Sequence, residues 1–287
     1  MRELDEHNIT DEVLRRFEGC SDARLKQVMT SLVCHLHDFV REVRLTEAEW
    51  NYAINFLTRA GQISDDRRQE MILLSDTLGV STLVDSVNNP PAPGATQSTV
   101  LGPFFVDAAP EAESGADIDP GEAGGGEPLF VDARVVDPSG APVAGAVVDV
   151  WHSDAEGLYD VQRPEGELAR RARFTTDAEG RLRFRTTMPA SYPIPDDGPV
   201  GDMLKATGRH PWRPAHVHFM ITAPGFRRLV THVFVDGDTY LDSDAVFGVK
   251  ESLIDAYPVR PAGTAPDGTP MARPFHVLTY NFGLTPA

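Results

Sequence analysis

The spacing of apolar residues changes once along this chain, and the change separates a helical part from a strand-rich part. Up to about residue 88, apolar residues recur at steps of three and four, as in the stripe from Leu25 to Val40, which is the period of an amphipathic helix. From Leu129 onward, short runs alternate apolar and polar residues between turns, which is the period of a strand. This order predicts an α+β fold, a helical N-terminal region followed by a β-sandwich.

Breakers between the two parts set the expected boundaries. A proline cluster at 89–94 precedes an acidic stretch at 107–128 that is rich in Gly, Ala and Pro. We therefore expect a helical region at 1–88, an irregular connection at 89–128 and the β-sandwich catalytic domain at 129–287.

Two helix starts are expected inside the N-terminal region. Thr46 and Glu49 have the spacing of a capping box. The acidic run Ser64-Asp65-Asp66 is expected to cap a further helix, which ends before Gly79.

Charge and cysteine content narrow the class of protein. The 287 residues carry a formal net charge of −17, which disfavours nucleic acid or an anionic membrane surface as a partner. The only two cysteines, Cys20 and Cys34, do not make a disulfide scaffold or a cysteine zinc site and are expected to be reduced core thiols. There is neither an apolar signal region at the start nor a run long enough to span a membrane. A cytoplasmic enzyme is the expectation.

Two histidines separated by one residue form the most informative motif. His216-Val217-His218 lies in an alternating run that predicts a strand, and residues i and i+2 of a strand point to the same face. Two imidazoles on one face make half of a metal site. His35 and His37 have the same spacing, but they lie in the helical stripe, where such a pair diverges. We expect that second pair to be structural.

Two tyrosines upstream narrow the choice of metal. Tyr159 and Tyr192 lie beside glycine or proline outside the expected strands. A phenolate is a hard anionic ligand with an ordinary pKa near 10, so a tyrosine ligand favours a trivalent cation such as ferric iron. The β region has no cysteine, which excludes thiolate ligands there. From the residues alone, a ferrous site with one carboxylate, a zinc hydrolase and two ordinary buried tyrosines all stay open.

Several segments together resemble one enzyme family. The similarity spans about residues 80 to 285, and it is clearest in 140–160, 192–199, 208–219, 223–225 and 237–244. These segments resemble the intradiol ring-cleavage dioxygenases, and the helical part is similar to the dimerisation region of the branch that acts on catechol and hydroxyquinol. The resemblance implies a homodimer formed through the N-terminal helices, with a possible phospholipid in the groove of the dimer.

The resemblance also implies a complete metal site with one Fe(III) per subunit. Tyr159 and His216 would be the equatorial protein ligands, and Tyr192 and His218 the axial ones. Tyr192 would accept a proton from the substrate, and Arg213 would lie beside the bound ring and stabilise negative charge on it. The implied reaction inserts both atoms of O2 between two adjacent hydroxyl-bearing carbons of an aromatic ring.

Several features resemble the hydroxyquinol branch, among them Asp160-Val161-Gln162 after the first tyrosine and Thr82-Leu83-Val84-Asp85 in the helical part. His232 stands where the catechol-cleaving members have glutamine, and Asp85 could hydrogen-bond the additional hydroxyl of a triol. The expected substrate is hydroxyquinol (1,2,4-trihydroxybenzene), with maleylacetate or its enol, 3-hydroxy-cis,cis-muconate, as the product. The alternatives are a catechol or chlorocatechol dioxygenase that forms a cis,cis-muconate and, more remotely, a β-sandwich binding module without activity.

Overall fold

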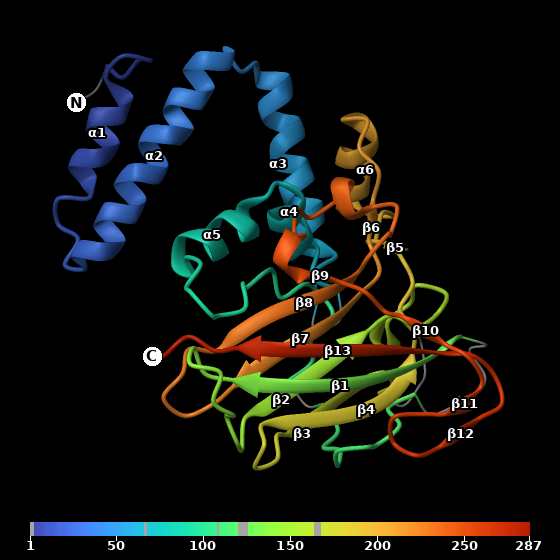
Figure 1. The fold of residues 1–287 in the computed structure, drawn as a ribbon. Helices are drawn as coiled ribbons and strands as arrows, with labels where there is room; N and C mark the ends of the chain where they lie inside the picture. The colour runs from blue at the N-terminus through green and yellow to red at the C-terminus, as the bar shows by residue number, and fades with distance from the viewer. Residues whose placement is uncertain (1–2, 66–67, 108, 120–125, 164–167) are drawn as a thin grey trace. The chain divides into compact units, whose positions relative to one another are not determined.

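The computed structural model describes residues 3–65, 68–107, 109–119, 126–163 and 168–287. Its contacts divide the chain into two compact units, Met1–Arg59 and Ala60–Ala287, and each unit is described by itself. The expected connection at 89–128 includes residues 108 and 120–125, which lie outside the described residues. The architecture, helices followed by mixed β-sheets, confirms the predicted α+β fold (Figure 1).

The first unit consists of helices. It holds α1 (Ile9–Arg16), α2 (Ala23–Val43) and most of α3 (Glu47–Gln62). The predicted capping box begins α3, because Glu49 accepts a hydrogen bond from the Thr46 amide at 2.8 Å and donates its own amide to Thr46 Oγ1. His37 lies on α2 with Nδ1 3.0 Å from Thr10 Oγ1, a contact of the structural kind expected for it.

Two further helices begin the second unit, α4 (Glu70–Thr77) and α5 (Val80–Asn88). The prediction that Ser64-Asp65-Asp66 caps α4 was wrong, because the helix starts at Glu70 without a side-chain cap; Asp66 itself lies outside the described residues. Asp65 Oδ1 instead accepts a hydrogen bond from the Arg68 amide at 2.7 Å, ahead of the helix, and the buried Glu70 side chain accepts one from the Val200 amide in the first turn of the helix Pro199–Ala206. The helix ends before Gly79, as predicted.

Two sheets form the β-sandwich that fills the rest of the second unit. The strand orders are β10-β13-β1-β4 and β3-β2-β7-β8-β9, and the two sheets lie face to face (Figure 1). The four-stranded sheet comprises β1 (Pro128–Val136), β4 (Arg181–Thr187), β10 (Val259–Arg260) and β13 (Phe275–Gly283). The five-stranded sheet comprises β2 (Val147–His152), β3 (Arg171–Thr175), β7 (His216–Thr222), β8 (Leu229–Val235) and β9 (Ile254–Asp255).

Short elements complete the unit. They are η2 (Asp160–Gln162), β5 (Tyr192–Pro193), α6 (Pro199–Ala206), β6 (Trp212–Arg213), η3 (Leu241–Ser243), η4 (Glu251–Leu253), β11 (Gly263–Thr264) and β12 (Pro270–Met271). Among the described residues, no helix is both long and apolar enough to cross a bilayer.

Strand alternation gives the five-stranded sheet two different faces. Val217, Phe219 and Ile221 of β7 point into the core between the two sheets. Their neighbours on β7 therefore point to the opposite face. There a second apolar cluster, which includes Leu73 of α4 and Leu204 of α6, covers the sheet. His216 and His218, two of the expected metal ligands, lie on this covered face.

Candidate metal centre

Four predicted ligands meet on the covered face of the five-stranded sheet. His216 and His218 come from β7, Tyr192 from β5, and Tyr159 from the turn before η2. The Nε2 atoms of the two histidines are 3.0 Å apart, and His218 Nε2 is 3.0 Å from the Tyr159 hydroxyl. The two tyrosine hydroxyls are 3.4 Å apart. All four side chains are at most 1% exposed.

Burial holds both histidines in the neutral form that binds metals. The pKa of His216 and of His218 is lowered well below its usual value, mainly by burial and also by the charge of Arg213. His216 Nδ1 lies 2.7 Å from the Pro214 carbonyl, so Nδ1 carries the proton and Nε2 has a free lone pair. Trp151 pairs with His218 across the β2–β7 ladder and stacks on its ring at a centroid distance of 4.5 Å.

Tyr159 is held in an apolar environment. Burial is the largest cause that raises the pKa of Tyr159 well above its usual value, and Tyr192 adds to it; Arg213 and Arg171 act in the opposite direction. The Phe104 ring stacks on the Tyr159 ring at 4.4 Å. The segment that carries Phe104 reaches His218 through Gly102, which has a φ of +78° and would place a Cβ 3.3 Å from His218 Cε1. Glycine tolerates this conformation, and a larger side chain would be strained.

Arg213 is the buried cation of the site. Its Nη1 atom lies 3.3 Å from both the Tyr192 hydroxyl and His216 Nε2. Asp244 accepts a hydrogen bond from Arg213 Nε at 2.9 Å and is itself held by the Gly248 amide at 2.9 Å. Burial opposes the charged guanidinium, but Asp244, Tyr192 and Tyr159 together raise the pKa of Arg213. The pair thus maintains one fixed positive charge beside two expected ligands.

The four donor atoms fit a ferric ion. They converge in a dry site that offers two neutral imidazoles and two phenols, and burial disfavours ionisation of Tyr159 unless a cation compensates its charge. A trivalent cation supplies that compensation better than a divalent one. The nitrogens of His216, His218 and His232 also form a cluster with potential ligand atoms within 4.8 Å of one another.

The predicted substrate-binding residues lie at different places. His232 of β8 is directly opposite His218 in the β7–β8 register, is fully buried, and stacks on His216 at 4.6 Å. Burial lowers the pKa of His232 well below its usual value. Asp85 of α5 accepts hydrogen bonds from Lys250 Nζ at 3.0 Å and Asn89 Nδ2 at 2.9 Å, so its carboxylate already has a cationic partner.

Sequence reasoning assigned no role to the acids that support these ligands. Asp160, directly after Tyr159, forms a bidentate ion pair with Arg171 at 2.6 and 2.7 Å, and Arg171 also donates to the Phe104 carbonyl. Asp244 belongs to the segment 237–244, which carried the family resemblance, but its partner is Arg213. No local pattern identifies such a pair, because its members approach one another only in the folded chain.

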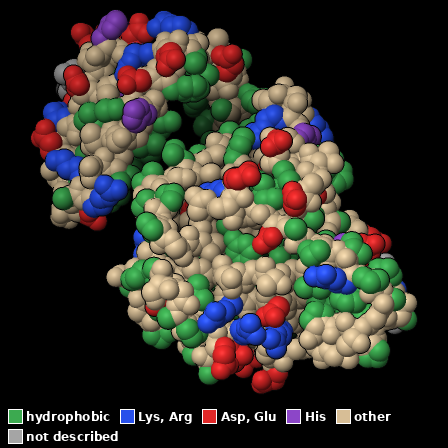
Figure 2. All heavy atoms as spheres, in the orientation of Figure 1, with side chains coloured by type: hydrophobic (Ala, Val, Ile, Leu, Met, Phe, Trp, Pro, Cys, Tyr) green, Lys and Arg blue, Asp and Glu red, His purple; other side chains and the backbone are tan. Residues whose placement is uncertain are grey.

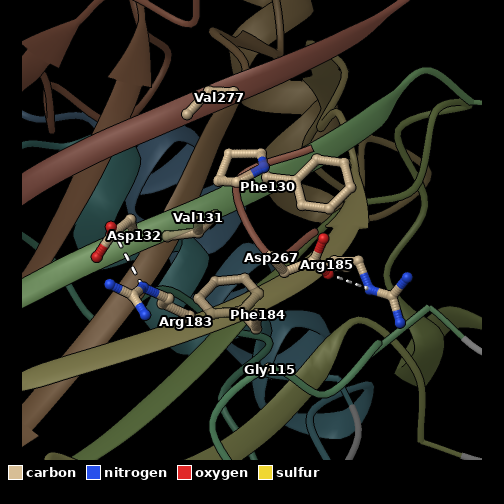
Figure 3. Close-up of a pocket in the computed structure, with 10 residues that line it drawn as sticks. Gly115, Phe130, Val131, Asp132, Arg183, Phe184, Arg185, Asp267 and Val277 are labelled. Atoms are coloured by element: carbon tan, nitrogen blue, oxygen red, sulfur yellow. Dashed lines mark ion pairs between the residues drawn. The ribbon is translucent and has the colours of Figure 1, made fainter. Parts of the chain in front are cut away.

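A separate pocket lies on the other sheet. Figure 3 shows many of its lining residues on β1 and β4, Phe130 and Phe184 among them. Its charged side chains already pair with one another, Arg183 with Asp132 and Arg185 with Asp267 (dashed lines in Figure 3). None of the predicted site residues is among the residues that line it.

The chain is similar to known proteins over most of its length. Residues 100–286 match the family described as "Dioxygenase", and residues 22–96 match "Catechol dioxygenase N terminus". The chain is 56% identical to a 6-chlorohydroxyquinol 1,2-dioxygenase of Cupriavidus pinatubonensis over 92% of this chain and 95% of that protein. It is 54% identical to a hydroxyquinol 1,2-dioxygenase of Corynebacterium glutamicum over 92% of this chain and 87% of that protein.

A solved structure is also similar to this chain. The crystal structure of a hydroxyquinol 1,2-dioxygenase from Pseudomonas putida DLL-E4 superposes with a TM-score of 0.88 at 49% identity, over 98% of this chain and 99% of that one. The family match covers most of the β-sandwich and the motifs that carry the ligands. The chain is therefore an enzyme that belongs to the intradiol ring-cleavage dioxygenases, the family that its sequence motifs resemble.

Proposed function

We propose that this enzyme cleaves hydroxyquinol with O2 to maleylacetate, or equivalently to 3-hydroxy-cis,cis-muconate. The observation that carries the reaction is the convergence of two tyrosine hydroxyls and two histidine Nε2 atoms in one buried site. The substrate assignment is supported by the relatives at 54–56% identity, which are named for hydroxyquinol or its 6-chloro derivative. His232, in place of glutamine, supports the same branch.

The family implies non-haem iron, and we propose one Fe(III) per subunit with Tyr159, Tyr192, His216 and His218 as its ligands. When bound, ferric iron withdraws electron density from a chelated diol and makes the ring reactive toward O2. The protein supplies the rest of the chemistry. The Tyr192 hydroxyl lies 3.3 Å from Arg213 Nη1, and as a phenolate it would accept a proton from one substrate hydroxyl.

Arg213 has two tasks in this proposal. Its guanidinium stabilises negative charge that develops on the ring oxygens, in a site where burial strengthens the interaction. Its Nη1 atom also donates a hydrogen bond to the Tyr192 hydroxyl at 3.3 Å and orients that side chain. Asp244 keeps the guanidinium in place for both tasks.

Specificity for a triol is assigned to His232 and Asp85. The His232 ring stacks on the His216 ring and so borders the proposed iron site. Asp85 is paired with Lys250, and a third ring hydroxyl can share the hydrogen bonds of that ion pair. Replacement of Asp85 by Asn is expected to lower kcat/KM for hydroxyquinol more than for catechol.

We further propose a homodimer that forms through the N-terminal helices, with phospholipid in its groove, and a cytoplasmic location. Seven apolar residues along α2 are 43–52% exposed in the single chain, namely Leu25, Val28, Leu32, Leu36, Phe39, Val40 and Val43. Figure 2 shows exposed apolar side chains among charged ones on the N-terminal helices. Such a stripe requires a partner surface, and a second copy or acyl chains would both suit it.

A single assay series tests the activity. Iron-loaded enzyme should be visibly red, because tyrosinate-to-iron charge transfer absorbs visible light, and it should turn over hydroxyquinol faster than catechol or chlorocatechol. Faster cleavage of catechol would overturn the substrate assignment. A colourless protein with stoichiometric zinc and no iron would overturn the reaction itself.

A further inference from the structure

One carboxylate joins the two chain segments that deliver Tyr192 and His216. Asp238 lies in the turn after β8, three residues beyond Val235, and is not an expected ligand. Its Oδ2 atom accepts a hydrogen bond from Ser191 Oγ at 2.5 Å and a second from the Ala215 amide at 2.9 Å. Ser191 directly precedes Tyr192, and Ala215 directly precedes His216. A single oxygen atom therefore connects the residues immediately before two ligands.

The rest of the turn is fixed on both sides. Asp238 Oδ1 accepts the Tyr240 amide at 2.9 Å, so both carboxylate oxygens are engaged. The Tyr240 ring stacks on Trp212 of β6 at 5.2 Å with an interplanar angle of 6°. The Ala215 carbonyl accepts the Val235 amide at 3.0 Å. The carboxylate thus has a rigid position relative to β7 and β8 from which to hold Ser191.

The chemistry of the contact explains why an acid stands here. The Ser191 hydroxyl and the Ala215 amide both donate to the same atom, and an ionised oxygen accepts two donors more strongly than a neutral one. Tyr192 lies on a strand of only two residues, and its neighbour Pro193 has no amide hydrogen to donate. β pairing alone therefore fixes the Tyr192 backbone weakly. A hydrogen bond through Ser191 can then change where the Tyr192 side chain lies.

We propose that Asp238 is a positioning residue that sets the separation of Tyr192 and His216, and through it the geometry and retention of the iron. This inference rests on the proposed iron site. It assigns Asp238 no contact with the substrate. Removal of the carboxylate should let the Tyr192 segment shift away from β7 without unfolding the sandwich.

The test compares three variants with a matched control. Asp238→Ala removes both links, and Ser191→Ala removes only the link to the Tyr192 segment. In Asp238→Asn, an amide oxygen in the place of Oδ2 can still accept from Ser191 and Ala215, at the expense of the Tyr240 contact. The control is Asp236→Ala, an exposed acid in the same turn. The readouts are the wavelength of the tyrosinate–iron absorption band, the rate of iron loss to a chelator, and the melting temperature of the iron-free protein.

We expect Asp238→Ala to shift the absorption band and to lose iron about 10- to 100-fold faster, as for other groups that orient metal ligands. Ser191→Ala should show part of this effect, Asp238→Asn should lie closer to the wild type, and Asp236→Ala should match it. The double variant Ser191→Ala, Asp238→Ala should be no worse than Asp238→Ala, because both changes remove the same link.

Three results would overturn the proposal. The first is a lower melting temperature in Asp238→Ala with an unchanged band and rate of iron loss, which would make the role purely structural. The second is full additivity in the double variant. If Asp238→Ala does not fold, an unchanged band and iron-loss rate in Ser191→Ala would be the third. A colourless wild type would instead overturn the proposed function, whereas a red wild type with an unaffected Asp238→Ala would overturn this inference alone.

Discussion

At the scale of single residues, the site combines buried charges whose form is set by their neighbours. Arg213 stays cationic at 1% exposure because Asp244 accompanies it, and the two expected histidine ligands stay neutral because they are buried beside that cation. Burial and neighbouring charge together set the protonation of these three side chains. A change in one of them should alter the chemistry of the others while the fold remains.

Arg213→Lys tests this coupling. Lysine keeps the positive charge but cannot form the two-pronged contact with Asp244 and also reach Tyr192. We expect kcat to fall about 10²-fold, the scale of losing one donor to developing charge, with the iron absorption band retained. Steady-state kinetics measure the loss, and Arg227→Lys, at an exposed arginine, serves as the control. Unchanged turnover in Arg213→Lys would remove the catalytic role of the guanidinium.

His152 makes the stability of the folded protein depend on pH, independently of catalysis. It is 1% exposed; Nδ1 lies 2.7 Å from the Ser153 carbonyl and Nε2 lies 2.8 Å from Thr186 Oγ1. Burial lowers the pKa of His152 from 6.5 to about 4. Between these two values the unfolded chain binds a proton that the folded chain does not, so stability rises with pH and is lost as the pH falls below 6.5.

Because of His152 alone, we expect the free energy of unfolding to fall by about 2 kcal/mol from pH 7 to pH 5. Urea unfolding of wild type and His152→Gln at both pH values measures it. The variant should lose about 2 kcal/mol less than the wild type over that interval, because glutamine does not titrate. An equal loss in both proteins would show that His152 does not contribute.

At the scale of elements, sequence periodicity predicted most of the framework. The alternation in β7 correctly placed two imidazoles on one face, because a strand has a fixed period that no tertiary contact alters. The start of α4 was not predicted, because Asp65 accepts a hydrogen bond from the Arg68 amide ahead of the helix and does not cap it. The Glu70 side chain of α4 accepts the Val200 amide of α6 from 130 positions away, a contact that no local pattern reveals. Arg171 and Asp160 illustrate the same limit, because their pairing requires β3 to be folded against η2.

That buried pair should account for much of the local stability around Tyr159. The side chains of Arg171 and Asp160 are 2% and 4% exposed. Arg171→Met would leave an unpaired buried carboxylate and is expected to cost about 3–5 kcal/mol. Arg183→Met removes an exposed partner of Asp132 and is expected to cost about 1 kcal/mol or less. Urea unfolding compares the two, and similar losses would contradict the role assigned to burial.

At the scale of the whole molecule, motifs predicted the expected ligands but not what supports them. Tyr159, Tyr192, His216 and His218 stand in motifs that can be recognised in order along the chain. Asp244 contacts Arg213 from 31 positions away, and Asp238 joins two segments that are distant from it in sequence. Such contacts exist only once the sandwich has formed, and sequence spacing carries no signal for them. The proposed dimer extends this reasoning to the exposed apolar stripe on α2, whose partner would lie on a second chain.

The proposed dimer predicts a definite response to one added charge on that stripe. Leu32 is 47% exposed and lies among apolar neighbours on α2, so Leu32→Glu would place a carboxylate in an apolar interface, where desolvation is costly. We expect the wild type to sediment as a dimer and Leu32→Glu as a monomer at the same concentration. Gln27→Glu adds the same charge at an exposed position of α2 outside the stripe and should remain dimeric. If Leu32→Glu stays dimeric, or if the wild type is a monomer, α2 is not the interface and its apolar stripe must have a different partner.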